Sequence, residues 1–242
     1  MKLNAHTALS TPTLLLVPYS EHHVPHYHEW MKDPDLQSAT ASEPLSLEEE
    51  YAMQRSWRGD RDKLTFIICQ PLRQKDDREQ RPGMSHVRVG EDDSPERMIG
   101  DINLFLFDAE IEEGEREVEE LGGSGSGSVV GEVELMIARK SLQRQGFGRA
   151  ALLTFIDYIH THWPDIAAEY AQSGAITPQL SFLRVKINQT NVGSIRLFEG
   201  VGFIRTTEEP NYFGELELRF VPDLEGLRKQ KGWEEVVELG YG

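Results

Sequence analysis

The segment Gln143-Arg144-Gln145-Gly146-Phe147-Gly148-Arg149-Ala150 decides the fold of this chain. It stands between a short strand-like stretch and a strongly apolar stretch with helical spacing. Two glycines one residue apart let backbone N–H groups crowd around a ligand where a side chain would clash. A following helix adds its unpaired N–H groups and the positive end of its dipole. The combination is typical of a phosphate or pyrophosphate site, although short glycine patterns alone are common.

Composition places the chain among globular proteins and argues against two classes of partner. Its 242 residues are 38% hydrophobic and 27% charged, which suits one domain with some polar loops. The formal net charge is -16 at pH 7. A chain this acidic repels nucleic acid and anionic membrane surfaces. It favours a basic substrate, such as a protein that presents an amine.

The single cysteine, Cys69, lies in the apolar run 64–69 and has no intrachain disulfide partner. A small buried hydrophobe is a better interpretation of it than a catalytic thiol. Low cysteine usage favours a cytoplasmic location, with the nucleus as an alternative. No apolar run is long enough to cross a bilayer, and residues 14–17 are too short for a signal peptide.

Periodicity predicts a mixed sheet with helices on its faces, within the α/β (α+β) classes. We expect strands at 13–17, 64–69, 98–107, 132–138, 180–187, 203–204 and 215–221. We expect helices at 21–31, 46–59, 148–160 and 191–199. Ser46 and Glu49 form a capping box at the start of the second helix.

The remaining segments are predicted to be irregular parts of a single domain over residues 1–242. Residues 71–97 are charged and aperiodic, and 108–130 combine an acidic run with Gly/Ser repeats, so both are interpreted as flexible insertions. Residues 162–179 are expected to be a connector, and 224–242 a peripheral tail. Among the histidines of 21–31, His22 and His26 have metal-ligand spacing, but Pro25 disturbs the turn and no third ligand is evident. We therefore expect a solvated helix face and no metal.

A second pattern follows the glycine loop after about forty residues. Asn191 and Ser194 start a helix, Leu197 and Phe198 lie on its apolar side, and Gly202-Phe203 turns into the next strand. Alone this is an ordinary capped helix. Its distance from the glycine loop makes a functional interpretation of both patterns more specific.

Together the two patterns resemble those of the GNAT superfamily of acetyl-CoA-dependent N-acetyltransferases. The glycine loop matches the family's Gln/Arg-x-x-Gly-x-Gly/Ala, and the later segment matches its Asn-x-x-Ser/Ala motif. Short segments nearer the N-terminus are similar to those of the eukaryotic N-acetyltransferase 9-like branch. Examples are Leu16-Val17-Pro18-Tyr19 and Gly100-Asp101-Ile102-Asn103-Leu104-Phe105-Leu106. That branch is similar to bacterial enzymes that modify ribosomal-protein N-termini. The resemblance implies a single domain whose mixed, mostly antiparallel sheet is splayed at the cofactor site.

The resemblance also implies where acetyl-CoA binds. Backbone amides of the loop would surround the pyrophosphate, and an edge of the preceding strand would pair with the pantetheine arm and polarise the thioester carbonyl. Residues of the later motif would contact the cofactor from the other side. The implied cofactor-binding residues are Met136, Ile137, Ala138, Gln143, Arg144, Gln145, Gly146, Phe147, Gly148, Arg149, Asn191, Ser194 and Phe198.

The implied reaction is direct attack of a protein or peptide amine on acetyl-CoA in a ternary complex. Such an amine must lose its proton, so a carboxylate base is useful. Glu132 and Glu134 share one strand face, and we favour Glu132 because several family members carry their catalytic glutamate there. Both can equally be solvent-facing strand residues. Glu43, Asp101 and Asn103 are candidates to receive a cationic substrate.

One departure from the family supports a competing hypothesis. Many members place a tyrosine, as acid for the departing thiolate, where this chain has Phe198. Tyr212 or water would then supply the proton, or activity would be weak. The alternative function is a degenerate, CoA-binding acetyltransferase fold that acts as a protein-interaction module. The substrate, the choice between an N-terminal amine and a lysine, and the oligomeric state stay open.

Overall fold

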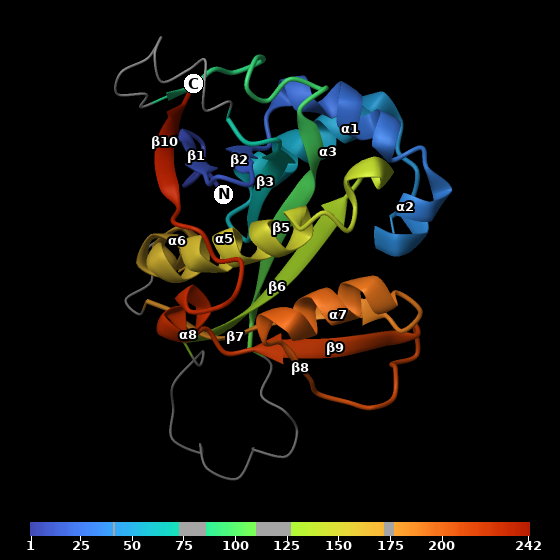
Figure 1. Cartoon of the computed structure of the whole chain (residues 1–242), viewed down its shortest axis with the longest axis vertical. Coiled ribbons are helices and arrows are strands. Elements are labelled where there is room, and N and C mark those ends of the chain that lie inside the picture. Colours follow the sequence, from blue (N-terminus) through green and yellow to red (C-terminus); the bar gives the residue numbers. More distant parts are fainter. Residues whose placement is uncertain (41, 73–85, 110–126, 172–176) are drawn as a thin grey trace.

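Two central strands, β3 (Lys63–Cys69) and β5 (Met98–Asp108), are buried on both faces over most of their length, as expected for strands covered on both sides. The computed structural model describes residues 1–40, 42–72, 86–109, 127–171 and 177–242. In these residues ten strands form one sheet in the order β4-β10-β1-β2-β3-β5-β6-β7-β9-β8 (Figure 1). The β10–β4 and β6–β7 pairs are parallel and the other pairs are antiparallel. The predicted α+β fold with a mixed, mostly antiparallel sheet is confirmed.

The other strands are β1 (Thr7–Ser10), β2 (Leu15–Pro18), β4 (His86–Val87), β6 (Ser128–Ile137), β7 (Gln179–Asn188), β8 (Ile204–Arg205), β9 (Glu215–Phe220) and β10 (Val237–Tyr241). The α-helices are α1 (Val24–Trp30), α2 (Pro34–Thr40), α3 (Leu47–Gly59), α5 (Phe147–Thr161), α6 (Trp163–Ala171), α7 (Val192–Val201) and α8 (Leu224–Arg228). Two 3-10 helices are η1 (Glu21–His23) and η2 (Lys140–Leu142). The predicted capping box is present at the start of α3. None of the described helices has the length and apolarity needed to cross a bilayer.

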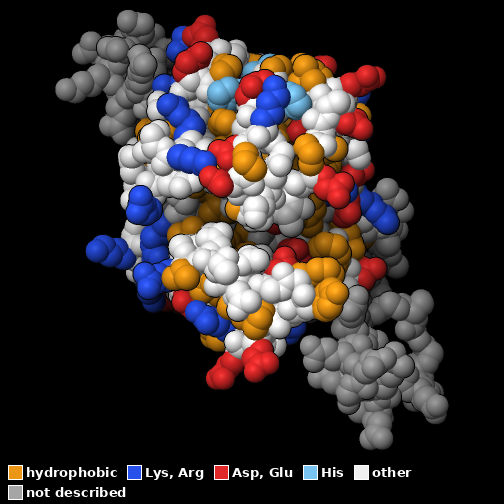
Figure 2. Space-filling view, turned by 90° about the vertical axis from the view of Figure 1, so that its right-hand side faces the viewer, with side chains coloured by type: hydrophobic (Ala, Val, Ile, Leu, Met, Phe, Trp, Pro, Cys, Tyr) orange, Lys and Arg blue, Asp and Glu red, His pale blue; other side chains and the backbone are white. Residues whose placement is uncertain are grey.

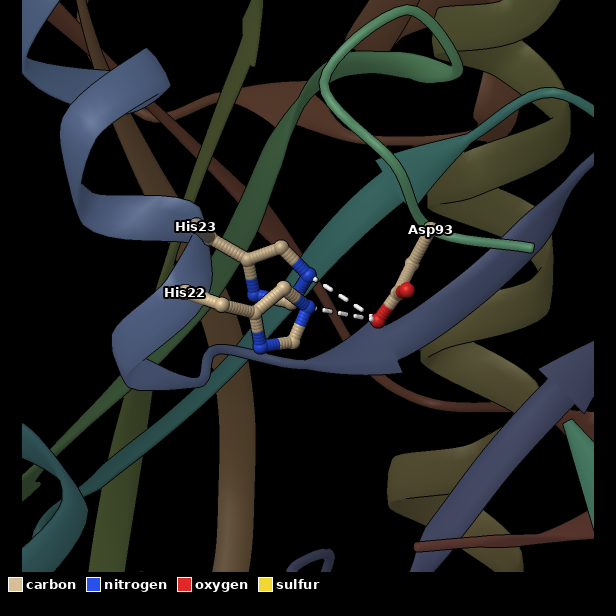
Figure 3. Close-up of side chains that lie close together, drawn as sticks. All are labelled: His22, His23 and Asp93. Atoms are coloured by element: carbon tan, nitrogen blue, oxygen red, sulfur yellow. Dashed lines mark hydrogen bonds and ion pairs between the residues drawn. The ribbon is translucent and has the colours of Figure 1, made fainter. Parts of the chain in front are cut away.

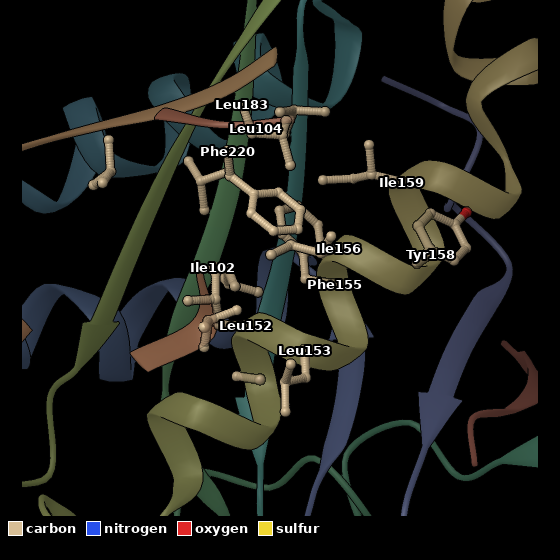
Figure 4. Close-up of a cluster of buried hydrophobic side chains, with 14 of the residues drawn as sticks. Ile102, Leu104, Leu152, Leu153, Phe155, Ile156, Tyr158, Ile159, Leu183 and Phe220 are labelled. Atoms are coloured by element: carbon tan, nitrogen blue, oxygen red, sulfur yellow. The ribbon is translucent and has the colours of Figure 1, made fainter. Parts of the chain in front are cut away.

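Helix α5 forms the centre of the larger core. All ten residues from 150 to 159 are buried, because the sheet covers one side of the helix while α6, α7 and α8 pack around the rest. Phe155 meets Phe66 of β3 edge-to-face, with ring centroids 6.0 Å apart. Figure 4 shows Phe155 among side chains of β5, β7 and β9. Burial of each such side chain stabilises the fold by roughly 1.5–3 kcal/mol, so α5 fixes the loop that precedes it.

The opposite face of the sheet carries a second core beneath α1 and α2. Val24, Tyr27 and Met31 from the α1 region pack with Val17 and Ile67 of the sheet. Because strand side chains alternate between faces, Ile67 points to this core while its neighbours Phe66 and Ile68 belong to the other. Helices on both faces of the sheet are therefore confirmed.

The sheet opens between β6 and β7. Strand β6 pairs with β5 over its whole length, from Val129 opposite Asp108 to Ile137 opposite Gly100. Its pairing with β7 ends at Glu132 opposite Arg184. From there the described part of β7 pairs with β9 alone. We call the opening between residues 133–137 and 185–188 the wedge, and it is the predicted splay.

Several predicted boundaries need correction. Residues 224–242 do not form a peripheral tail, because β10 pairs with β1 and β4, and Leu227 and Tyr241 are buried. The local sequence pattern does not reveal this pairing, because β10 and its partner β1 stand at opposite ends of the sequence. Residues 163–171 of the expected connector form α6. Parts of the two predicted insertions, 86–97 and 127–130, belong to the described structure, whereas 73–85 and 110–126 lie outside the described residues.

A buried carboxylate, Asp93, joins its own segment to η1 and to β10, which are distant in sequence. Figure 3 shows its contacts with His22 and His23. Its Oδ2 accepts hydrogen bonds from His22 Nε2 at 3.0 Å, His23 Nε2 at 3.1 Å and Tyr241 Oη at 2.6 Å. Its Oδ1 accepts from the backbone N–H of Gly90 at 2.6 Å. Burial by itself would raise the pKa of Asp93, but the side-chain hydrogen bonds outweigh it and hold this pKa well below its ordinary value. The cluster thus ties β10 to η1 and to residues 86–97.

The same three side chains, His22, His23 and Asp93, lie close enough to ligate a metal ion. The proton on His23 argues for a hydrogen-bonded junction instead. Its Nδ1 accepts from the backbone N–H of Ser20 at 3.0 Å, so in the neutral ring Nε2 must carry the hydrogen that Asp93 receives. Burial lowers the pKa of His23, which favours this neutral ring. The expected solvated histidine face is wrong for His23, which is fully buried.

Replacing Tyr241 with Phe should destabilise the protein by roughly 1.5–3 kcal/mol, because it removes a hydrogen bond to a buried carboxylate. Chemical denaturation followed by circular dichroism measures the change. Tyr212→Phe is the matched control, since Tyr212 is 98% exposed and should change stability by less than about 0.5 kcal/mol. Equal stability of Tyr241→Phe and the wild type would contradict the junction.

Candidate functional site

The glycine loop at the start of α5 has an unusual backbone. Gly146 has φ +95° and Arg144 has φ +61°, both in the left-handed region. A Cβ at Gly146 would meet no atom within 4 Å, so the backbone angle demands glycine there and the space beside it is open. Gly146 is the N-cap of α5 and gives no side-chain cap. The amides of residues 147–149 therefore lack a helical partner and suit an anion.

Gly148 has a different role from Gly146. A Cβ at this position would lie 3.2 Å from Leu197 Cδ2, 3.7 Å from Leu135 Cδ2 and 3.8 Å from Ile137 Cγ1. Its missing side chain thus lets the first turn of α5 approach both α7 and β6. We predicted ligand contact for both glycines, and the geometry of Gly148 is that of close packing.

Two glutamines brace the loop. Gln143 Nε2 donates to the carbonyl of Ile137 at 2.8 Å, and Gln145 Nε2 donates to the carbonyl of Ser141 at 2.6 Å. The first bond ties the loop to the last residue of β6. Both glutamine side chains therefore serve the loop itself.

The side chain of Arg149 turns away from the loop. Its guanidinium donates to the carbonyls of Gly200 and Lys231 at 2.8 and 2.9 Å, and to Gln230 Oε1 at 3.1 Å. These bonds hold the start of α5 against the end of α7 and residues 230–231. Arg144 is exposed at the loop, and Phe147 is half-buried against the larger core.

The strand beside the loop offers a free backbone edge. Met136 and Ala138 are buried in the core beneath α1 and α2, whereas Ile137 packs against the larger core. Within the described pairing, residues 133–137 have a strand neighbour on the β5 side and none on the β7 side. The carbonyl of Ile137 accepts from Gln143, and the rest of this edge has no partner strand on the β7 side, so it can pair with an extended ligand.

Helix α7 contributes its N-terminus to the wedge and its buried side to the core. Asn191 is the N-cap, and its Oδ1 accepts from the backbone N–H of Ser194 at 3.2 Å. Phe198 is 3% exposed and meets Phe203 edge-to-face with centroids 5.0 Å apart. The backbone N–H of Asn191 donates to the carbonyl of Asn188 at 2.8 Å, so the start of α7 directly follows the β7 side of the wedge. Phe198, by contrast, has a place in the core. Tyr212, the alternative proton donor, is fully exposed in the β8–β9 connection.

Glu132 is engaged in an ion-pair network. Its Oε2 lies 2.7 Å from Arg184 Nε and 3.4 Å from Lys186 Nζ, both on β7. Arg184 is also its partner in the last β6–β7 rung. Two cations on one carboxylate oxygen make Glu132 a clasp between the strands and a poor candidate for a free base.

Glu134, two residues further along the same face, has no such partner among the described residues. Burial raises the pKa of its carboxyl to about 7, and the nearby carboxylates of Asp101, Glu132 and Glu215 add to the rise. Glu134 is nevertheless an exposed residue of β6, so solvent screening moderates this rise in its pKa. A carboxyl that titrates near neutral pH suits proton transfer.

Asp101 and Asn103 stand on the same face as Glu134, in the neighbouring strand β5. Asn103 is the register partner of Glu134, and Asp101 is the partner of Met136. Burial raises the pKa of Asp101 to about 6, against hydrogen bonds to its carboxylate from Asn103 and Tyr27. The structure thus unites two of the three predicted substrate residues with the candidate base.

Glu43, the third predicted substrate residue, is exposed in the connection between α2 and α3. No hydrogen bond or ion pair links it to Asp101 or Glu134 within the described parts of the chain. Sequence reasoning instead missed Glu50, which is 2% exposed and whose pKa burial raises to about 6. It also missed Tyr27, which donates to Asp101 at 3.4 Å. Glu50 stands in a run of three glutamates, so composition gave no sign that one of them turns inward.

The molecule is hollowed on the side that carries the ends of β6 and β7. Figure 2 faces this side and shows acidic side chains in a hollow between an upper and a lower half of the molecule. In Figure 1 the upper half holds α1, α2 and α3, and the lower half holds α7 and β9. The candidate site therefore combines an anion-binding loop, a free strand edge and an acidic recess.

Comparisons with known proteins agree with this geometry. A family model described as an acetyltransferase (GNAT) domain matches residues 13–204. An N-acetyltransferase 9-like protein of Schizosaccharomyces pombe is 37% identical over 231 residues, covering 91% of this chain and 99% of the relative. Human alpha/beta-tubulin-N-acetyltransferase 9 is 37% identical over 220 residues, covering 90% of this chain and 85% of the relative.

Solved structures share the fold at low sequence identity. The spermidine N-acetyltransferase of Vibrio cholerae, solved with CoA and spermine, aligns with a TM-score of 0.55 at 14% identity. The alignment covers 86% of this chain and 93% of that one. A ribosomal L7/L12 alpha-N-protein acetyltransferase in complex with coenzyme A gives 0.53 at 13% identity, covering 88% and 97%. With the family model and the full-length relatives, this establishes that the chain is an N-acetyltransferase that belongs to the GNAT family and to its N-acetyltransferase 9-like branch.

Proposed function

We propose that this chain transfers the acetyl group of acetyl-CoA to a primary amine of a protein or peptide, by direct attack in a ternary complex. The observation that carries the proposal is the wedge, which opens beside an uncapped helix start. One side of this arrangement suits a phosphorylated carrier, and the other presents carboxylates to an amine. Cys69 is fully buried, which fits a reaction without an acyl-enzyme.

The chain's groups fit acetyl-CoA in charge and shape. Amides from Arg144 to Arg149, with Gly146 facing open space, suit the pyrophosphate. The free edge of β6 around Met136 and Ile137 suits the amide-rich pantetheine arm, and an N–H there can polarise the thioester carbonyl. Asn191 and Ser194, at the start of the helix that follows the β7 side of the wedge, would contact the carrier from that side. Acetyl-CoA supplies an activated acyl group, so the protein has to bind, orient and deprotonate.

Glu134 is the base in this proposal, in place of Glu132. Glu132 holds two cations of β7, whereas Glu134 has no cation within ion-pair distance in the described chain. An α-ammonium group has a pKa of about 8 and a lysine about 10.4, so either needs help at neutral pH. Glu134 takes a proton from the ammonium nitrogen, leaving an amine lone pair, and later returns that proton to solvent.

A protein amine is the proposed acceptor because the recess is acidic and the whole chain carries a net charge of -16. Relatives whose names give alpha/beta-tubulin as their substrate support a protein acceptor. The alternative, a CoA-binding interaction module, draws its support from Phe198, which has no proton to donate. Turnover separates the two, because a module binds CoA and acetylates no amine.

Replacing Gly146 with Val should weaken CoA binding by at least about tenfold. A β-branched residue at φ +95° costs on the order of 1–2 kcal/mol and distorts the amides that face the anion. Isothermal titration calorimetry with CoA measures the change. Gly59→Ala is the control, because Gly59 has an ordinary backbone and open space around it. Unchanged affinity in Gly146→Val would contradict the loop assignment.

Replacing Glu134 with Gln should lower kcat by about 10²–10⁴-fold, the usual contribution of a positioned base. In the wild type, kcat should rise with pH through about 7 as Glu134 ionises. This rising limb of the pH–rate profile should be lost in the variant. Stopped assays of CoA release from pH 5.5 to 9 with a peptide panel measure both.

Glu132→Gln is the matched control for the base. It should retain the pH-dependent rise in activity, moved to somewhat lower pH because the charge of Glu132 helps to raise the pKa of Glu134. It should lower kcat by less than about tenfold, because the Glu132 carboxylate holds β7 and takes no proton from the amine. The assignment is wrong if Glu132→Gln removes the limb and Glu134→Gln keeps it.

A further inference from the structure

Three polar side chains form a row across the sheet on the face of the candidate site. Thr65 of β3, Asn103 of β5 and Glu134 of β6 are successive register partners. Asp101 lies two residues from Asn103 on the same face. Asp101 and Asn103 are 3% and 4% exposed. Polar groups this deeply buried are normally hydrogen-bonded.

Two acceptor oxygens on this face of the sheet lack a donor among the described residues. Asp101 Oδ1 and Asn103 Oδ1 are both buried without a hydrogen-bond partner. The other oxygen of Asp101, Oδ2, accepts from Asn103 Nδ2 at 2.8 Å and from Tyr27 Oη at 3.4 Å. These contacts fix the carboxylate and leave one oxygen of each side chain to be satisfied.

Water accounts for the neighbouring orphan atoms better than for these two. Tyr19 Oη and Thr65 Oγ1 are also unpartnered, and both residues line a cavity of about 10 Å³, the size of one water. The lining of that cavity does not include Asp101 or Asn103. Asp101 also has no cation within ion-pair distance in the described structure, and a buried carboxylate without one is costly.

A primary ammonium group offers three N–H donors and one positive charge. The site offers Asp101 Oδ1, Asn103 Oδ1 and the carboxylate of Glu134 as acceptors on one face of adjacent strands. We propose that Asp101, Asn103 and Glu134 bind the ammonium group of the acceptor, with Tyr27 as the residue that positions Asp101. This inference rests on the proposed function, because the row adjoins the wedge where the acyl group would be presented.

Binding of this kind makes the site selective for the form of the nitrogen. A primary ammonium satisfies all three acceptors, whereas the acetylated product keeps one N–H and no charge. The product therefore leaves buried acceptors unpaired, which disfavours its binding. A cation without N–H donors has the charge but cannot make the hydrogen bonds.

The test compares methylammonium with tetramethylammonium and potassium, as chlorides at equal ionic strength, on the CoA-loaded protein. The side-chain amide resonance of Asn103, followed by ¹⁵N NMR, reports binding without any turnover. Methylammonium should shift this resonance saturably, and the other two ions should not. An equal response to all three ions, or to none, would overturn the proposal in favour of a general cation site or of ordered water.

Variants test the same point with a peptide acceptor. Asp101→Asn should raise KM for the amine by at least about tenfold, weaken methylammonium binding similarly and leave CoA affinity unchanged. Tyr27→Phe should have a smaller effect in the same direction, and it serves as a second variant if Asp101→Asn folds poorly. Glu48→Gln is the control, an exposed carboxylate on α3.

The outcomes distinguish this inference from the proposed function. Methylammonium binding that depends on Asp101, without acetylation of any amine, would contradict the proposed function and support the ammonium site. Acetylation by Asp101→Asn with an unchanged KM for the amine would contradict the ammonium site and support the proposed function.

Discussion

The end of the β6–β7 pairing at Glu132 and Arg184 is the constraint on which the rest of the site depends. Gly131 sits one residue before this point, where a Cβ would lie 2.7 Å from side-chain atoms of both Leu104 and Leu183. The core therefore fills the space around the last paired residues and holds them together. The ion pair between Glu132 and Arg184 closes the same rung from the other face.

Beyond that rung, packing keeps the strands apart. Gly148 lets the first turn of α5 approach Leu135 and Ile137 of β6, and Leu197 of α7 reaches the same point. The uncapped start of α5 thus stands next to the free edge of β6 because the same contacts create both. A carrier that is phosphorylated at one end and amide-rich along its arm meets matching groups at the two places.

The central part of this arrangement could be predicted from the sequence because its signals are local. The loop around Gly146, the N-cap at Asn191 and the paired polar faces of β5 and β6 each need only a few neighbouring residues. The ion pairs that lead us to propose Glu134 rather than Glu132 as the base could not, because they involve Arg184 and Lys186, which lie some fifty residues away in a parallel strand. Asp93 shows the same limit, since the partners that bury it come from both ends of the chain. Glu50 was hidden because helical periodicity does not reveal which member of an all-glutamate run faces inward.

Phe198 has to be judged against the same energetics. It packs in the core beside Phe203, so an aromatic ring at this position contributes to the stability of α7 whether or not it bears a hydroxyl. A thiol has a pKa of about 8.5, so a thiolate departs without much help from an acid. Activating the amine is the harder task, because its pKa of about 8 to 10.4 keeps it protonated at neutral pH. In our proposal Glu134, Asp101 and Asn103 bind and deprotonate the amine while Phe198 stays in the core, so the polar groups serve the amine rather than the departing thiolate.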